Sequence, residues 1–211
     1  MQEAQRPVFR LQWLPVILVS TGLMLIGALA IRELGGGMPS QRPTPGRVGP
    51  LAEVSLEPLG VQLRTPESWP PPVIVDAHRF VLSPDGEADT RTTAGPFLFV
   101  VVDALDVFRE QLTFRTDLSD PRQQLDALVD ALNRNGPRFG PSEVYYGAGY
   151  PAAIVRGYER GNELTLILMR TDEGRWVYVG AQAIEADFRY YELNVFKPAT
   201  DSIRLAARQA P

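Results

Sequence analysis

The side chains that could take part in catalysis are few. The only histidine is His78, and Asp76 lies two residues before it, so both side chains would share one face of a strand. A histidine acting as general base needs a nucleophile beside it, and the sequence contains no Gly-x-Ser-x-Gly nucleophile elbow. We therefore interpret His78 as a surface or turn residue and keep a hydrolase that uses it as the alternative.

Asp103 and Asp106 form a second candidate, because they follow directly on the apolar run 97–102. Two carboxyl groups held close together can serve glycoside chemistry, one as the acid and one as the nucleophile. Acidic residues at the end of a strand also mark the point where the chain meets water. We predict no catalytic residue, and the Asp103/Asp106 pair stays with His78 as the alternative centre of an envelope hydrolase.

Aromatic residues gather in the second half of the chain. Tyrosine and tryptophan give a large contact area at low entropic cost, so some of them could line a surface for a peptide, a lipid tail or a sugar. The competing interpretation places them in the core or in cross-strand pairs. The residues of this candidate binding surface are Tyr146, Tyr150, Tyr158, Trp176 and Tyr178.

The composition excludes several classes of site. The 211 residues are 45% hydrophobic and 22% charged, which is typical of a globular protein. The absence of cysteine excludes disulfides, zinc sites with thiolate ligands, cysteine nucleophiles and a lipidated N-terminal cysteine. A single histidine excludes a site with several histidine ligands. We predict no metal and no cofactor.

Residues 11–31 predict a transmembrane helix that follows a short cytoplasmic N-terminus, residues 1–10. The segment carries no charge, and as a helix it would span roughly 31 Å, about the thickness of a hydrocarbon core. Arg6 and Arg10 precede it, so the positive-inside rule places the N-terminus in the cytoplasm and the remainder outside. The alternative is a cleaved signal peptide, with cleavage after Ala30, and a secreted domain.

A linker rich in glycine and proline is expected at residues 32–54. Residues 35–50 contain five glycines and four prolines, which favour neither a helix nor a sheet ladder. Residues 1–50 carry a net charge of +3, from five arginines and two acids, whereas residues 51–211 carry −7, from 16 basic and 23 acidic residues. The acidic part argues against binding to nucleic acid.

The remaining residues predict one domain, 55–205, followed by a short tail, 206–211. Asp120 and Pro121 are typical of a helix start, and Leu125, Leu128 and Val129 lie on one face of that helix, 120–135. A second amphipathic helix is expected from Phe188 onward. Short polar turns join the later strands, which indicates an antiparallel meander and an α+β fold. The expected strands cover residues 60–65, 80–83, 97–102, 143–146, 152–158, 164–170 and 175–184.

The stretch Gly60-Val-Gln-Leu-Arg-Thr-Pro-Glu-Ser-Trp69 resembles the opening of the PsbP/DcrB-like superfamily, a strand followed by Pro-x-x-Trp. The helix 120–135, the turn 149–152, the meander and the segment 196–203 follow in that family's order, over residues 55–205. The resemblance implies an α-β-α sandwich around an antiparallel sheet. It also implies no shared active site, because the characterised relatives are mostly non-catalytic.

Together these features predict a membrane-anchored domain outside the cytoplasm that binds a protein or a small ligand at the cell envelope. The anchor, the linker and the lack of a catalytic motif support this interpretation. A linker that lets a domain move near the membrane suits the capture of a partner there.

Overall fold

The structure is a computed structural model, and it describes residues 48–86, 95–133, 138–147, 149–159 and 161–206. The expected transmembrane helix, 11–31, and the expected linker up to residue 47 lie outside the described residues. Among those described, no helix combines the length and the apolar character that crossing a membrane requires.

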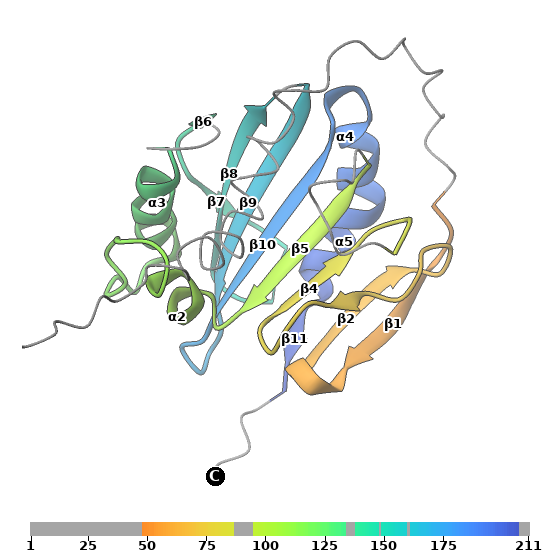
Figure 1. Cartoon of the computed structure of the whole chain (residues 1–211), viewed down its shortest axis with the longest axis horizontal. Coiled ribbons are helices and arrows are strands. Elements are labelled where there is room, and N and C mark those ends of the chain that lie inside the picture. Colours follow the sequence, from red (N-terminus) through yellow and green to blue (C-terminus); the bar gives the residue numbers. More distant parts are fainter. Residues whose placement is uncertain (1–47, 87–94, 134–137, 148, 160, 207–211) are drawn as a thin grey trace, which may run out of the picture.

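An eight-stranded antiparallel sheet forms the centre of the domain (Figure 1). Its strands are β3 (Val73–Ile74), β4 (Arg79–Leu82), β5 (Phe97–Val102), β10 (Trp176–Ile184), β9 (Asn162–Arg170), β8 (Ala152–Glu159), β6 (Arg138–Phe139) and β7 (Glu143–Tyr145). The first six are named in their order across the sheet, and β6 and β7 both pair with β8. The antiparallel α+β class predicted from the sequence is therefore confirmed.

The predicted meander is β8–β9–β10, and glycines with positive φ occupy both of its turns. Gly161 has a φ of +82° just before β9, and Gly174 has a φ of +77° before β10. L side chains rarely adopt such angles, so these glycines allow the tight connections that the turn signals predicted.

Strand β5 is central because all six of its residues are buried. Its side chains alternate between the two faces of the sheet. Leu98, Val100 and Val102 belong to one cluster of buried residues, which we call the first core. Phe97, Phe99 and Val101 belong to another, the second core, on the opposite face. A continuous apolar strand is thus covered on both sides, as its sequence predicted.

The helices α2 (Ala104–Arg109) and α3 (Pro121–Leu132) cover the second core (Figure 1). The Asp120 carboxylate accepts a hydrogen bond of 2.9 Å from the backbone N–H of Gln123, which caps α3. The predicted stripe of Leu125, Leu128 and Val129 is buried against the sheet.

The C-terminal helices cover the first core. They are α4 (Glu185–Tyr191), a π-helical turn η3 (Glu192–Phe196) and α5 (Lys197–Ser202). Pro198 lies in the first turn of α5, and in a regular helix its ring would crowd the carbonyl of Asn194. The π turn immediately before it is a local adjustment of the kind that lets a helix continue.

A small second sheet lies beside the C-terminal helices (Figure 1). Its order is β1 (Leu51–Leu56), β2 (Val61–Pro66) and β11 (Arg204–Leu205), and the short 3-10 turn η2 (Glu57–Leu59) joins the first two strands. Val61 and Leu63 face the first core, whereas Gln62 and Arg64, which alternate with them, are exposed. Residues 51–54, which the sequence assigned to the linker, form most of β1. The fold therefore begins before the expected boundary at residue 55.

Candidate functional site

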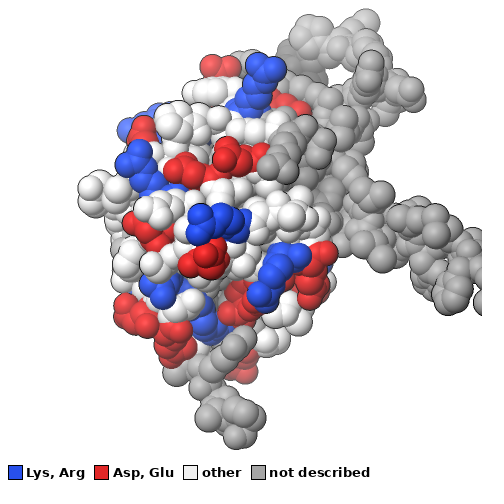
Figure 2. Space-filling view, turned by 90° about the vertical axis from the view of Figure 1, so that its left-hand side faces the viewer, with Lys and Arg blue, Asp and Glu red and all other residues white. Residues whose placement is uncertain are grey.

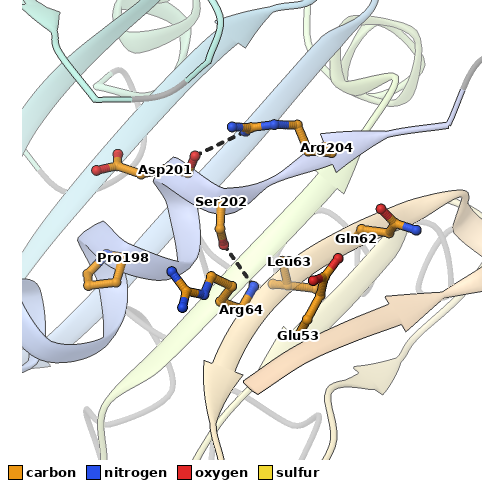
Figure 3. Close-up of a pocket in the computed structure, with 8 residues that line it drawn as sticks. All are labelled: Glu53, Gln62, Leu63, Arg64, Pro198, Asp201, Ser202 and Arg204. Carbon is orange, nitrogen blue, oxygen red and sulfur yellow. Dashed lines mark hydrogen bonds between the residues drawn. The ribbon is translucent and has the colours of Figure 1, made fainter. Parts of the chain in front are cut away.

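A groove of about 400 Å³ lies between the outer face of the small sheet and the end of α5 (Figure 3). The alternation of the strands builds it. Because Val61, Leu63 and Thr65 point inward, the residues between them point outward, and the register places Glu53 opposite Arg64 and Gln62 opposite Arg204. The residues that line the groove are Glu53, Gln62, Leu63, Arg64, Pro198, Asp201, Ser202 and Arg204.

Two of the charged groups of the groove are engaged within the fold. The Arg204 guanidinium donates hydrogen bonds to the backbone carbonyls of Asp201, at 3.1 Å, and of Ile203, at 2.7 Å. Cations are favourable at this position, because the last carbonyls of a helix carry partial negative charge. The Asp201 carboxylate points away from the groove and bonds elsewhere (Figure 3).

Arg64 and Glu53 are the available charges. Both are exposed, and neither forms an ion pair with any residue that the structure describes. The Arg64 backbone is nevertheless fixed, since its N–H donates a 2.7 Å hydrogen bond to the Ser202 hydroxyl (Figure 3). A guanidinium held on a rigid strand can bind a carboxylate or phosphate in a two-point contact, and a neighbouring carboxylate can accept from a donor on the same ligand.

A cluster of three side chains supports the groove from behind, and we call it the clasp. The Asp201 carboxylate accepts hydrogen bonds from the Tyr145 hydroxyl, at 2.7 Å, and from the Lys197 ammonium, at 2.6 Å. Lys197 also donates to the carbonyl of Tyr146, at 3.1 Å. Burial and the hydrogen bond to Asp201 raise the pKa of Tyr145 far above its ordinary value, so its hydroxyl stays a donor.

The clasp explains the position of Gly147. A Cβ at this residue would lie 2.3 Å from Lys197 Nζ and 2.6 Å from Asp201 Oδ2, and the φ of Gly147 is +132°. The positive φ and the close approach of these two side chains therefore favour glycine at this position. Lys197 is the only lysine in the sequence, which otherwise carries 20 arginines. A compact ammonium fits this confined space, whereas a planar guanidinium is larger.

The comparisons with known proteins give similar folds only. The Mog1 protein, solved as a mutant, is 10% identical, with a TM-score of 0.45 over 75% of this chain and 97% of that one. The PsbP protein of Synechocystis sp. PCC 6803 (CyanoP), solved in solution, is 13% identical, with a TM-score of 0.46 over 79% and 100% of the two chains. No protein-family model and no curated protein matches the chain. We assign function from this chain's own residues.

The five aromatic residues of the predicted binding surface do not come together. Tyr178 is 3% exposed and belongs to the second core, against which Trp176 also packs. Tyr150 packs against the first core, on the other face of the sheet. Tyr146 and Tyr158 are 80% and 58% exposed. The alternation of the strands thus divides the set between two faces, and it places Tyr178 where no ligand reaches it.

His78 lies in the turn between β3 and β4 and is exposed. Its backbone N–H donates to the Asp76 carboxylate at 2.9 Å, and its carbonyl accepts from Val102 at 2.8 Å. Burial by itself would raise the pKa of Asp76, but hydrogen bonds from Arg79 and from the His78 N–H outweigh it and lower that pKa. Asp76 therefore braces the turn through the His78 backbone and the Arg79 side chain.

Asp103 and Asp106 are engaged by different arginines. Both oxygens of Asp103 accept hydrogen bonds from the Arg175 guanidinium, at 2.9 and 3.2 Å, and the side chains of this pair are 10% and 13% exposed. Asp106 is exposed and pairs with Arg109 on the next turn of α2. Asp103 and Asp106 line one concavity of about 330 Å³. Their carboxylates differ in partner and in burial, and the Asp103 carboxylate closes the end of β5 against the start of β10.

Charge on the face that carries α3 is mixed. Figure 2 shows acidic and basic side chains interspersed over this side of the molecule, with no extended area of one sign. The described residues also contain no group of three or more histidine or carboxylate side chains that could hold a metal ion. Two concave sites carry charged groups, this groove and the concavity at the end of β5. In that concavity four of the five charged side chains form ion pairs with one another, whereas Arg64 and Glu53 are available in the groove, which we therefore take as the candidate.

Sequence reasoning missed the residues of this groove and of the clasp. The single lysine and the pair Gly147 and Gly149 were visible signals, because an unusual residue and closely spaced glycines mark a tight approach of backbone to side chain. Gly149 indeed lies against the Arg204 guanidinium, which a Cβ there would approach to 3.2 Å. Arg64 carried no such signal.

Proposed function

We propose that the protein is a membrane-anchored domain outside the cytoplasm that binds a partner through the groove and catalyses no reaction. The partner presents an acidic group to Arg64. The observation that carries this proposal is the contrast between engaged and available charges: Asp103 is engaged by Arg175, whereas Arg64 and Glu53 stay available at a concave surface.

The residues just before β1 are fixed on the domain, which supports the anchoring part of the proposal. Val48 packs against the first core, and its N–H donates a 3.0 Å hydrogen bond to the Tyr190 hydroxyl. Gly49 donates to the Ser68 hydroxyl at 3.3 Å, and Glu67 donates to the Pro50 carbonyl at 2.9 Å. The last residues before β1 thus belong to the domain, so a pull on the preceding chain acts on a fixed point beside α4.

The fixed backbone of β2 at Arg64 supports the binding part of the proposal. Arg64 stands on a strand whose neighbours Leu63 and Thr65 are 1% and 4% exposed, and the Ser202 hydroxyl holds its backbone. A binding group on a rigid element loses little freedom when the ligand arrives, so more of the contact free energy remains as affinity. The open shape suits an exposed segment of a partner protein better than a small molecule that needs to be enclosed.

Location is tested first, with the full chain in cells. A Ser55→Cys variant has the only thiol of the chain, and a membrane-impermeant maleimide should label it in intact cells once any outer barrier is opened. The protein should sediment with membranes and resist extraction by salt. Labelling only after lysis of the inner membrane, or recovery in the soluble cytosol, would contradict the anchored, extracytoplasmic location.

Binding is tested by crosslinking from the groove. A photoreactive residue in place of Gln62 should give a defined adduct in cells, whereas the same residue in place of Asp130 on α3 should not. Arg64→Ala should abolish the adduct from position 62, and Arg109→Ala, which removes an exposed arginine of α2, should leave it. Equal adducts from both positions, or an adduct indifferent to Arg64, would refute the groove as the binding site.

A further inference from the structure

The outer edge of β1 is the longest open strand edge that the described residues present. β1 has six residues and pairs with β2 on one side only. The other outermost strands, β3, β6, β7 and β11, have two or three residues each. An open edge offers a row of unpaired N–H and C=O groups to another strand.

The register fixes which groups of β1 point outward. Glu67 donates to the Pro50 carbonyl, so this pair is hydrogen-bonded, and in an antiparallel ladder the bonded pairs alternate with unbonded ones. Ala52, Val54 and Leu56 therefore bond to β2. Leu51, Glu53 and Ser55 direct their N–H and C=O groups to the open edge. The Arg64 N–H agrees with this pattern, because it bonds to Ser202 and not to the opposite Glu53.

Little in the sequence of β1 protects this edge. Natural edge strands are commonly blunted by lysine, by proline, by a bulge or by short length. Residues 51–56 read Leu-Ala-Glu-Val-Ser-Leu, with one charge and neither proline nor lysine. Leu51, Ala52 and Val54 are only half-buried, so an added strand would cover apolar surface as well as backbone.

We propose that a second copy of this chain occupies the edge, with two β1 strands pairing antiparallel about Val54. The two small sheets then become one six-stranded sheet. Directly opposed residues must lie on the same face, so only residues of the same parity can pair. Two registers meet this condition near the middle of β1.

Charge selects between these two registers. One places Glu53 against Glu53 of the other copy, and directly opposed like charges are destabilising. The other places Val54 against Val54, Glu53 against Ser55, and Ala52 against Leu56. The second register sets the carboxylate beside a hydroxyl donor and keeps apolar residues together on the inner face. Its Glu53–Ser55 pairs are also the ones whose backbone groups point to the edge.

Membrane anchoring supplies the concentration that this contact needs, and in this respect the inference rests on the proposed function. Pairing of two short strands buries less surface than a stable interface between free proteins. Two copies confined to one membrane meet at a far higher effective concentration. The expected linker meets the domain at Val48, three residues before β1, so the β1 edge lies at the end of the domain where the chain to the proposed anchor begins.

Disulfide formation between single-cysteine variants of this cysteine-free chain reports the register of the β1 pair directly. Full-length variants Ala52→Cys, Glu53→Cys, Val54→Cys and Ser55→Cys are oxidised mildly in membranes, with Gln62→Cys on β2 as the control for random collision. Opposed Cα atoms of an unbonded antiparallel pair are about 4.5 Å apart, within the range that a disulfide bridges. We expect a disulfide dimer from Val54→Cys and little from the other four.

A charge swap at position 55 provides the matched control. In the Val54→Cys background, Ser55→Glu places a glutamate opposite Glu53 of the other copy on both sides of Val54, and this should lower the disulfide yield about fivefold. Ser55→Lys places a lysine opposite Glu53 instead and should preserve the yield. Ser55 is exposed, so neither change disturbs the monomer, and thermal melts of the reduced variants verify this.

Each result decides the inference. A dimer from Glu53→Cys in place of Val54→Cys would overturn the register, and equal dimers from Gln62→Cys would show collision alone. No dimer in sedimented membranes, or an adduct of Val54→Cys with a different protein, would overturn the second copy as occupant. Recovery of the chain in the cytosol would instead refute the anchoring, and the Val54→Cys yield measured there would still test the pairing.

Discussion

The two sheets of this domain differ in how they meet water. The eight-stranded sheet is covered on both faces, and its central strand β5 has no exposed residue. Within the part of the chain that the structure describes, the three-stranded sheet is covered on one face, and its other face carries Glu53, Gln62, Arg64 and Arg204. The first sheet is thus built for stability, and the second presents charged groups from a fixed backbone.

This difference is the basis for the binding surface that we propose. Charged groups at the ends of strands of the large sheet form ion pairs within the fold, as Asp103 after β5 does with Arg175 before β10. On the small sheet the same residue types remain available, because its outer face and the edge of β1 have no covering element among the described residues. Substitutions should therefore cost stability in the large sheet and interactions in the small one.

The largest expected effect is in the centre of the large sheet. Leu98→Ala removes a fully buried side chain of β5 and should lower the free energy of unfolding by about 3 kcal/mol. Val54→Ala on β1, which is only half-buried, should cost less than about 1 kcal/mol. Urea unfolding of both variants measures the difference. Equal losses would show that the two sheets are not energetically distinct.

The second-largest loss of stability is expected at the Asp103–Arg175 ion pair, at the end of β5. Asp103→Ala leaves the Arg175 guanidinium without its carboxylate in a place that is mostly shielded from water, and should cost about 2 kcal/mol. Asp103 also has a φ of +54°, which asparagine tolerates better than alanine does. Asp103→Asn should therefore lose less than Asp103→Ala in thermal melts. The reverse order would contradict a structural role for this carboxylate.

A smaller effect is expected at the clasp, which joins β7 of the large sheet to α5. Gly147→Ala places a Cβ against Lys197 and Asp201 at a positive φ, and should cost about 1.5 kcal/mol. Gly140→Ala serves as the control, because its Cβ would meet its nearest neighbour at an ordinary 3.7 Å. Chemical denaturation compares them, and a harmless Gly147→Ala would mean that the loop is not held by the clasp.

The smallest effect depends on pH. Burial by itself would raise the pKa of Glu192, but hydrogen bonds from Arg156 and Arg189 outweigh it and leave the pKa below its ordinary 4.5. A lowered pKa means that the folded state favours the carboxylate, so this stability is present above pH 4.5 and lost as the pH falls through the folded value. Glu192→Gln should therefore cost about 1 kcal/mol at neutral pH.

The difference between Glu192→Gln and the unaltered protein should shrink from its value at pH 7 to nothing at an acidic pH below the folded pKa of Glu192, where both side chains are neutral. Unfolding curves at the two pH values measure it, with Glu110→Gln as the control for the same substitution at an exposed position. A difference that stays constant with pH would mean that the ion pairs with Arg156 and Arg189 contribute nothing.

Strong local patterns made much of the large sheet predictable. The expected strands at 97–102 and 175–184 coincide with β5 and β10 to within one residue, because long apolar runs between turn signals have one interpretation. The helix at 120–135 followed from its cap and its apolar stripe, and α3 occupies 121–132. Neither inference needed information about distant residues.

The remaining features depended on distant partners. β3, β6 and β11 have two residues each, too few to show any alternation, and their backbone bonds go to strands elsewhere in the chain. β1 follows a run of glycine and proline, which favoured a linker and concealed the strand. The clasp joins Tyr145 to Asp201 across 56 positions. The predicted aromatic surface grouped residues by their type, whereas the position of each residue along its strand decides which face of the sheet it occupies.

The central ladder of the large sheet has a consequence for the order in which the chain is made. Val102 of β5 pairs with Val177 of β10, 75 positions later. During synthesis β5 therefore lacks its neighbour β10 until most of the domain has left the ribosome. Contacts this distant in sequence also form slowly.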